Sequence, residues 1–159
     1  MSDVIQGTCS CGNIRYQLNQ APLFIHCCHC TWCQRESGSA FAINALIETA
    51  SVELLEGEPE ALVVPSNSGK GQKILRCQHC NVTLWSHYVG AGESLSFIRV
   101  GSLLQAPLFA PDIHIFTESK LPWVVLPENI PAVAQYYRAS QFWPASSLER
   151  RAKLQASAT

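Results

Sequence analysis

The chain has 159 residues, of which 47% are hydrophobic and 14% charged, so it is large enough to bury a hydrophobic core in a single domain. Its formal charge is −1 and its 11 lysines and arginines are scattered along the chain. The sequence therefore lacks the cluster of basic residues that binds DNA or RNA, and we expect no nucleic-acid partner. The first residues show no basic segment followed by an apolar stretch, and no run of about 18 apolar residues occurs, so we expect no secretory signal, no membrane partner and a cytoplasmic protein.

Short runs of alternating apolar and polar residues dominate the chain and predict β-strands. In the first of them, Ile14, Tyr16 and Leu18 would share one face. The predicted strands cover residues 13–18, 41–47, 51–55, 61–64, 73–77, 83–89, 95–100 and 113–116, and glycines and prolines punctuate them. The pattern therefore predicts a mainly β fold.

Helix is predicted at only three places. One lies directly after Cys30, one begins at Pro131 in "PAVAQYY", and one covers "SSLERRAKLQ", residues 146–155. The final stretch "RAKLQASAT" is expected to be frayed or disordered. We therefore divide the chain into a β domain at residues 1–135 and a peripheral C-terminal helical extension with a frayed tail at residues 136–159.

Eight cysteines occur in clusters rather than at the spread spacings of a disulfide framework. Because disulfides seldom persist in a reducing cytosol while metal sites do, the clustering favours zinc. The alternative is a set of free buried thiols or disulfide pairs. The cysteines are Cys9, Cys11, Cys27, Cys28, Cys30, Cys33, Cys77 and Cys80.

The first predicted metal site joins "CSCG", with Cys9 and Cys11, to "CQHC", with Cys77 and Cys80. Four thiolates complete a tetrahedral zinc shell and leave no open position, which is typical of a structural site. A residue that tolerates a left-handed backbone commonly follows such a cysteine pair, and Gly12 and Asn81 stand at these two places.

The second predicted site is the C-x-C-x-x-C formed by Cys28, Cys30 and Cys33. Three protein ligands leave zinc one position for water or substrate, so this set suggests a catalytic ion. Cys27, His26 or His29 could supply a fourth ligand and close the site. In an extended strand, Cys27 and His29 would point away from Cys28 and Cys30, which disfavours both.

Four segments in this order resemble the glutathione-dependent formaldehyde-activating family, which also includes a centromere protein. They are "GTCSCG", "CCHCTWCQRESGS", "RCQHC" and "PDIHIFTESKLPWV". The resemblance implies a coiled, mainly antiparallel β zinc fold of the Mss-four-like kind. It also implies one structural zinc on Cys9, Cys11, Cys77 and Cys80, and one catalytic zinc on Cys28, Cys30 and Cys33. Two features depart from the family pattern: Asn81 stands where glycine is usual, and Cys27 adds a thiol.

The activity implied by the resemblance is that of a carbon–sulfur lyase resembling S-(hydroxymethyl)glutathione synthase. Glutathione would bind as the thiolate and attack formaldehyde. His114 is the candidate that would donate a proton to the developing alkoxide, with Glu36 and His87 behind it. The same chemistry on another thiol and aldehyde, and a non-enzymatic zinc scaffold, are the alternatives. The oligomeric state is left open.

Further residues are candidates for contact with glutathione. Trp32 lies between two proposed ligands and could wall the substrate pocket, and Arg35 could bind a carboxylate. Lys70, Lys73 and Arg99 are alternative cations. The aromatic residues Trp85, Phe97, Phe116 and Trp123 are expected in the core.

Overall fold

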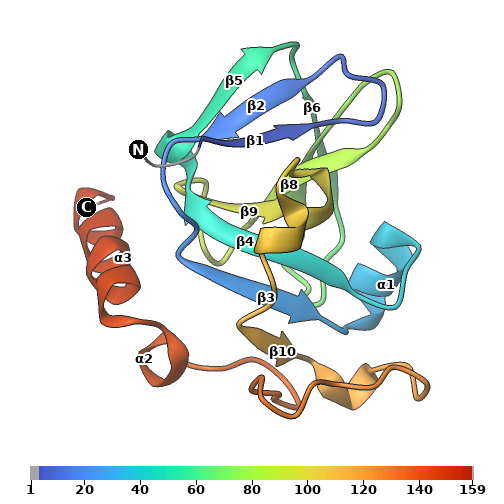
Figure 1. The fold of residues 1–159 in the computed structure, drawn as a ribbon, viewed down its shortest axis with the longest axis vertical. Coiled ribbons are helices and arrows are strands. Elements are labelled where there is room, and N and C mark those ends of the chain that lie inside the picture. Colours follow the sequence, from blue (N-terminus) through green and yellow to red (C-terminus); the bar gives the residue numbers. More distant parts are fainter. Residues whose placement is uncertain (1–3, 159) are drawn as a thin grey trace.

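The computed structural model describes residues 4–158, in which two β-sheets are joined by short connections and few helices (Figure 1). This arrangement confirms the predicted mainly β fold. The strands are β1 (Ile5–Thr8), β2 (Arg15–Leu18), β3 (Phe24–Cys28), β4 (Ala42–Glu48), β5 (Val52–Glu56), β6 (Glu60–Val64), β7 (Gln72–Arg76), β8 (Thr83–Tyr88), β9 (Leu95–Arg99) and β10 (Ile113–Ile115). The helices are α1 (Thr31–Ser37), α2 (Ala139–Phe142) and α3 (Ala145–Ser157), with single-turn 3-10 helices η1 (Thr49–Ser51), η2 (Val100–Ser102), η3 (Ala106–Leu108) and η4 (Thr117–Ser119).

The smaller sheet has the order β1-β2-β5, and the larger sheet has the order β10-β3-β4-β9-β8-β7-β6. The paired strands are antiparallel except for β10, which lies parallel to β3 and places His114 opposite Cys27. Strands β1 and β3 lie outside the strands that alternation predicts. All five residues of β3 are buried, so β3 lacks the alternation that a half-exposed strand shows.

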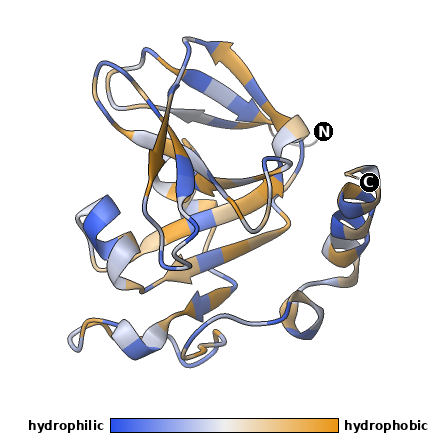
Figure 2. Ribbon diagram, turned by 180° about the vertical axis from the view of Figure 1, so that it is seen from behind, coloured by the Kyte–Doolittle hydropathy of each residue, from blue (hydrophilic) through white to orange (hydrophobic). Residues whose placement is uncertain are grey.

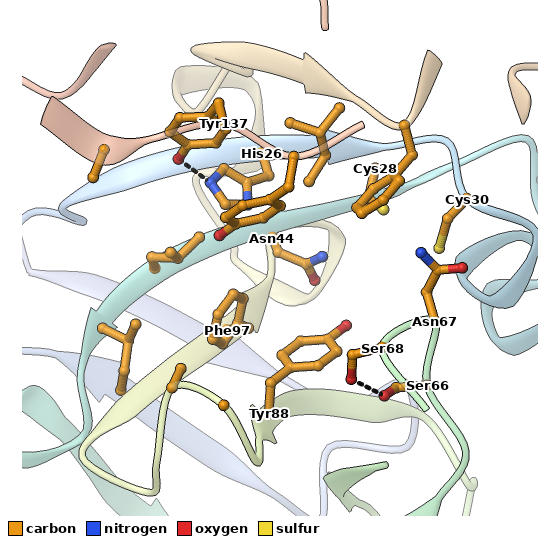
Figure 3. A pocket seen from close by; sticks show the side chains of 18 of the residues that line it. His26, Cys28, Cys30, Asn44, Ser66, Asn67, Ser68, Tyr88, Phe97 and Tyr137 are labelled. Atoms are coloured by element: carbon orange, nitrogen blue, oxygen red, sulfur yellow. Dashed lines mark hydrogen bonds between the residues drawn. The ribbon is translucent and has the colours of Figure 1, made fainter. Parts of the chain in front are cut away.

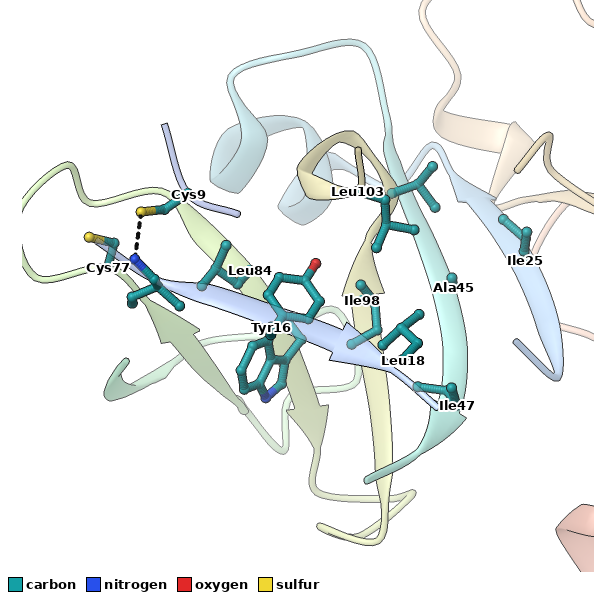
Figure 4. Close-up of a cluster of buried hydrophobic side chains, with 13 residues drawn as sticks. Cys9, Tyr16, Leu18, Ile25, Ala45, Ile47, Cys77, Leu84, Ile98 and Leu103 are labelled. Carbon is teal, nitrogen blue, oxygen red and sulfur yellow. Dashed lines mark hydrogen bonds between the residues drawn. The ribbon is translucent and has the colours of Figure 1, made fainter. Parts of the chain in front are cut away.

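One core lies between the two sheets (Figure 4). Tyr16 and Leu18 of β2 are buried there, as the alternation predicts, with Ile47 of β4 and Ile98 of β9 in the same cluster. The ring of Tyr16 also meets Trp85 edge-on, with ring centroids 5.3 Å apart. This core fixes the face of the larger sheet that is turned toward the smaller sheet.

The opposite face of the larger sheet carries a second cluster. Along β3, Ile25 belongs to the first core whereas Phe24 belongs to the second, and along β4 Ala45 and Leu46 divide in the same way. This is the two-residue alternation of a strand. It matters for function because the even-numbered residues of β3, including Cys28, lie on the second face.

The predicted helix at residues 131–137 is wrong, because this segment is extended beside β10. His114 N donates to the carbonyl of Pro131 at 2.9 Å, and Val133 N donates to the carbonyl of His114 at 2.9 Å. β10 lies at the outer edge of the larger sheet, so its outward backbone groups have no strand to pair with unless this segment lies beside them. Pairing with that edge outweighs the local helix propensity of the segment.

The predicted C-terminal helix is confirmed as α3, which also includes residues 151–157, where the sequence analysis expects a frayed tail. Helix α3 alternates between hydrophilic and hydrophobic residues (Figure 2), and Leu148 and Leu154 pack against the second cluster. The prediction of Trp123 in the core is also wrong, since 72% of its surface is exposed. Among the helices described, none is long and apolar enough to cross a membrane.

Candidate metal centres

The first cysteine cluster joins the two sheets. Cys9 and Cys11 lie in the turn between β1 and β2, and Cys77 and Cys80 lie in the turn between β7 and β8. Their four sulfur atoms lie within 4.8 Å of one another. The structure therefore brings together the four residues that the sequence analysis grouped.

The sulfur spacing fits a metal ion better than a disulfide. The Sγ atoms of Cys9 and Cys11 are 3.6 Å apart, as are those of Cys11 and Cys77. Zinc–sulfur bonds of about 2.3 Å in a tetrahedron would place the sulfurs roughly 3.8 Å apart, whereas a disulfide bond is about 2.0 Å long. The four thiols are all free cysteines.

Backbone geometry at both turns supports the cluster. Gly12 has a φ of 80° and Asn81 a φ of 61°, so both occupy the left-handed region that the sequence analysis expected after each cysteine pair. The amide of Ile14 donates to the Cys9 sulfur at 3.3 Å. A backbone hydrogen bond from Val82 lowers the pKa of Cys80 to about 6. Such contacts favour the thiolate forms that bind metal.

The second cluster contains Cys28, Cys30 and Cys33, all of them buried, with sulfur atoms within 4.8 Å of one another. Cys28 is the last residue of β3, and Cys30 caps α1 by accepting a hydrogen bond from the amide of Cys33 at 3.3 Å. The end of a strand and the first turn of a helix thus bring the three thiols together.

The three thiols of the second cluster are so close that ionisation of one raises the pKa of its neighbours. Contacts from Cys28 and Cys33 lower the pKa of Cys30 to about 3. The contacts of Cys28 with Cys30 and Cys33 raise the pKa of Cys28 far above its ordinary value. A bound divalent cation would remove this conflict, because it lets neighbouring thiols ionise together. The donor set therefore fits zinc.

A third cluster, on the other side of β3, contains Cys27, His29 and His114. The Cys27 sulfur lies 3.6 Å from His29 Nε2, which is 2.9 Å from His114 Nδ1. Cys27 and His29 thus point away from Cys28 and Cys30, as strand geometry predicts. Burial, with the positive charges of His114 and Lys120, lowers the pKa of His29 to about 4.

A cavity of about 830 Å³ opens beside the second cysteine cluster (Figure 3). Cys28 and Cys30 line it from one end, and Tyr88 directs its hydroxyl toward the same region. The connection between β6 and β7 borders the cavity through Ser66, Asn67, Ser68 and Lys70. The size is within the range of ligand pockets.

The other residues that the sequence analysis singled out divide between the cavity and other places. Trp32 lines the cavity with 37% of its surface exposed, whereas Arg35 is exposed on α1 and lies outside the lining. His114 also lies outside it, because β10 directs its side chain to the third cluster. This placement does not support its predicted role as proton donor.

The alternative residues are engaged elsewhere. Glu36 is ion-paired with Arg99 at 2.5 Å, and His87 Nδ1 contacts the carbonyl of Leu95 at 3.0 Å. Lys73 is ion-paired with Glu93 at 2.5 Å. Of the alternative cations, Lys70 lines the cavity and the other two do not.

Sequence reasoning missed most of the cavity wall. Tyr88 was assigned to a strand without a role, and residues of the C-terminal extension, including Tyr137, Arg138, Trp143 and Arg151, received no role. Only the density of aromatic and basic residues at 136–151 could have indicated them.

Comparisons with known proteins identify the family and a similar structure. A family model described as glutathione-dependent formaldehyde-activating enzyme matches residues 4–119. Among solved structures, a crystal structure of a Rhodobacter sphaeroides protein is similar with a TM-score of 0.49 and 16% sequence identity, covering 80% of this chain and 99% of that chain. None of the curated proteins matches this chain.

Proposed function

The chain belongs to the glutathione-dependent formaldehyde-activating enzyme family, and on that premise we propose that it is a zinc-dependent carbon–sulfur lyase. It would hold the thiol of glutathione at Cys28, Cys30 and Cys33 for addition to an aldehyde such as formaldehyde, giving S-hydroxymethylglutathione. The observation that carries the proposal is three buried thiols converging at the end of a cavity.

The two cysteine sites would have different roles. Cys9, Cys11, Cys77 and Cys80 supply four ligands, a complete shell that is typical of a structural ion. The second site has three cysteines, and the neighbouring Cys27 is turned to the other side of β3. Zinc bound there would supply the positive charge that keeps an incoming thiol ionised at neutral pH. We expect two zinc ions per chain.

Cationic side chains of the cavity suit the two carboxylates of glutathione. Lys70, Arg138 and Arg151 line the cavity, and in the described part of the chain no carboxylate is ion-paired with them. Arg151 also lies over the ring of Trp143, at 5.4 Å from its centroid. Charge-assisted hydrogen bonds from these groups would orient the peptide while its sulfur lies at the cysteine end.

We assign the proton donor of the addition to Tyr88. Its hydroxyl is directed toward the cysteine end of the cavity (Figure 3). Burial, with the negative charge of the nearby Cys33, raises the pKa of Tyr88 above its ordinary value. The hydroxyl therefore keeps its proton at neutral pH and can donate it to an oxygen that becomes negative during attack.

Titration calorimetry with glutathione and S-methylglutathione tests the proposal. The methylated ligand keeps both carboxylates but cannot ionise at sulfur, so we expect it to bind at least tenfold more weakly. Raising the pH from about 6 to 8 should tighten glutathione binding, because the free thiol, with a reference pKa of about 8.5, loses its proton more readily. The affinity of S-methylglutathione should change much less.

Matched variants locate the binding. Cys30→Ser should remove the advantage of glutathione over its methylated form. Cys27→Ser, the same substitution on the other side of β3, should keep it. Equal affinities for the two ligands in the wild-type protein at every pH would contradict the proposed function.

A further inference from the structure

Much of the cavity lies away from the cysteines and is lined by apolar and aromatic side chains. Leu46 and Phe97 form its floor on the larger sheet, and Tyr137, Trp143 and Leu148 of the C-terminal extension lie across it. These five residues form the aromatic end of the cavity. In Figure 3, Phe97 and Tyr137 are separated from Cys30 by the width of the cavity.

Three residues of the aromatic end, Tyr137, Trp143 and Leu148, lie beyond the family match at 4–119, yet hydrogen bonds hold the segment that carries them. The hydroxyl of Ser147 donates to the carbonyl of Leu23 at 2.6 Å, and Arg150 binds Glu48 through two nitrogens at 2.9 and 2.6 Å. These bonds join α3 to the larger sheet. The extension is therefore a built part of the cavity in this chain.

Side-chain contacts fix the aromatic rings themselves. Trp143 is stacked on Phe24 with ring centroids 5.7 Å apart, and its Nε1 donates to the hydroxyl of Tyr137 at 2.7 Å. The same hydroxyl is hydrogen-bonded to Nε2 of His26. Because these polar atoms bind one another, the ring faces of the aromatic end offer apolar surface, while the guanidinium groups of Arg138 and Arg151 border it.

Formaldehyde has one carbon and no apolar substituent, so it gains nothing from this surface. We propose that the aldehyde substrate carries an apolar substituent, a medium-length alkyl chain or an aromatic ring, which lies in the aromatic end while its carbonyl lies at the cysteines. This inference rests on the proposed function and specifies its substrate class. Burial of apolar surface would favour such an aldehyde over formaldehyde.

The reaction balances without an oxidant or a reductant. The sulfur electron pair forms a bond to the carbonyl carbon, and the π electrons of the carbonyl move to oxygen. The oxygen takes a proton in place of the one that the thiol lost. The product is a hemithioacetal of glutathione with an alkyl or aryl group on the new carbon.

S-hexylglutathione and S-methylglutathione are suitable probes, because neither can ionise at sulfur and they differ only in apolar length. Each buried methylene is worth roughly a fourfold gain in affinity. We therefore expect S-hexylglutathione to bind the zinc-loaded protein at least tenfold more tightly in calorimetry. Equal affinities would overturn the inference.

Two variants locate the hexyl group. Ala139 lines the cavity next to Arg138, so Ala139→Phe should occupy part of the aromatic end and bring the ratio of the two affinities close to one. Ala152→Phe, on the exposed surface of α3, should keep the wild-type ratio. A wild-type ratio in Ala139→Phe would overturn the placement of the substituent. Thermal melts verify that both variants are folded, and the wild-type comparison decides the inference if Ala139→Phe is not.

Glutathione itself separates the two hypotheses. Glutathione that binds more tightly than S-methylglutathione, together with no gain from the hexyl chain, would overturn the substrate class and leave the proposed function supported. Glutathione that binds no more tightly than S-methylglutathione would count against the proposed function. In exchange measurements by NMR, the enzyme should accelerate hemithioacetal formation from hexanal more than from formaldehyde, and the reverse order would overturn the inference.

Discussion

Replacing Tyr137 by phenylalanine should destabilise the protein through two buried partners of its hydroxyl. The hydroxyl accepts from Nε1 of Trp143 at 2.7 Å and is hydrogen-bonded to Nε2 of His26. His26 is 2% exposed and Trp143 is 7% exposed, so water reaches these two partners only from the cavity that they line. Burial lowers the pKa of His26 to about 3, so its ring is neutral at pH 7 and needs a neutral hydrogen-bond partner.

The size of the effect follows from the two orphaned groups. A buried polar group left without a partner costs about 1–3 kcal/mol, so two would cost about 2–6 kcal/mol, and local relaxation favours the lower half of that range. At about 3 kcal/mol, a domain of this size should lose roughly 6–12 °C in Tm, since each kcal/mol shifts Tm by about 2–4 °C. The aromatic ring stays in place, so little packing is lost.

Thermal unfolding followed by circular dichroism at fixed zinc concentration measures the shift. Tyr136→Phe is the matched control, because Tyr136 is the adjacent residue, is 55% exposed, and its hydroxyl has no hydrogen-bond partner among residues 4–158. We expect the control to change the free energy of unfolding by less than about 0.5 kcal/mol. Equal shifts for the two variants would refute the argument that the Tyr137 hydroxyl bonds hold the wall of the cavity.

The remaining predictions concern the metal sites, a turn and an ion pair. Cys77→Ser should lower the free energy of unfolding by several kcal/mol or prevent folding, whereas Cys30→Ser should leave a folded protein with one zinc fewer. Thermal melts and metal analysis measure both outcomes. Equal destabilisation by the two substitutions would contradict separate roles for the two metal sites. Asn81→Ala should cost about 1 kcal/mol in urea unfolding, because its φ is 61°, while Asn81→Gly should cost nothing. Partial burial tends to raise the pKa of Glu48, but hydrogen bonds from Arg150 outweigh burial and lower this pKa below 4.5. The stability that wild type has over Glu48→Gln should therefore be complete above about pH 4.5 and be lost as the pH falls further, and a constant difference in Tm from pH 7 to 3 would exclude this contribution.

The sequence by itself determined much of the metal chemistry and the fold class. The spacing within each cysteine pair and within C-x-C-x-x-C is a local property of the chain, and it predicted the ligands of the four-thiol and three-thiol clusters. The two pairs at Cys9 and Cys77 meet only in the folded chain. The two-residue period of a strand also placed Cys27 on the side opposite Cys28. Alternation located eight of the ten described strands and missed β1 and β3, of which β3 is buried on both faces.

Only the tertiary structure decided the surroundings of the three-thiol cluster. The sequence predicts His114 as a proton donor, but the parallel pairing of β10 with β3 places it beside His29. Residues 131–137 have helix-forming composition, yet the free edge of β10 holds them extended. The extension that carries Tyr137 and Trp143 then reaches the cavity. These outcomes depend on contacts between segments that are far apart in sequence, and the local periodicity of a segment does not record which distant edge or cavity it will meet.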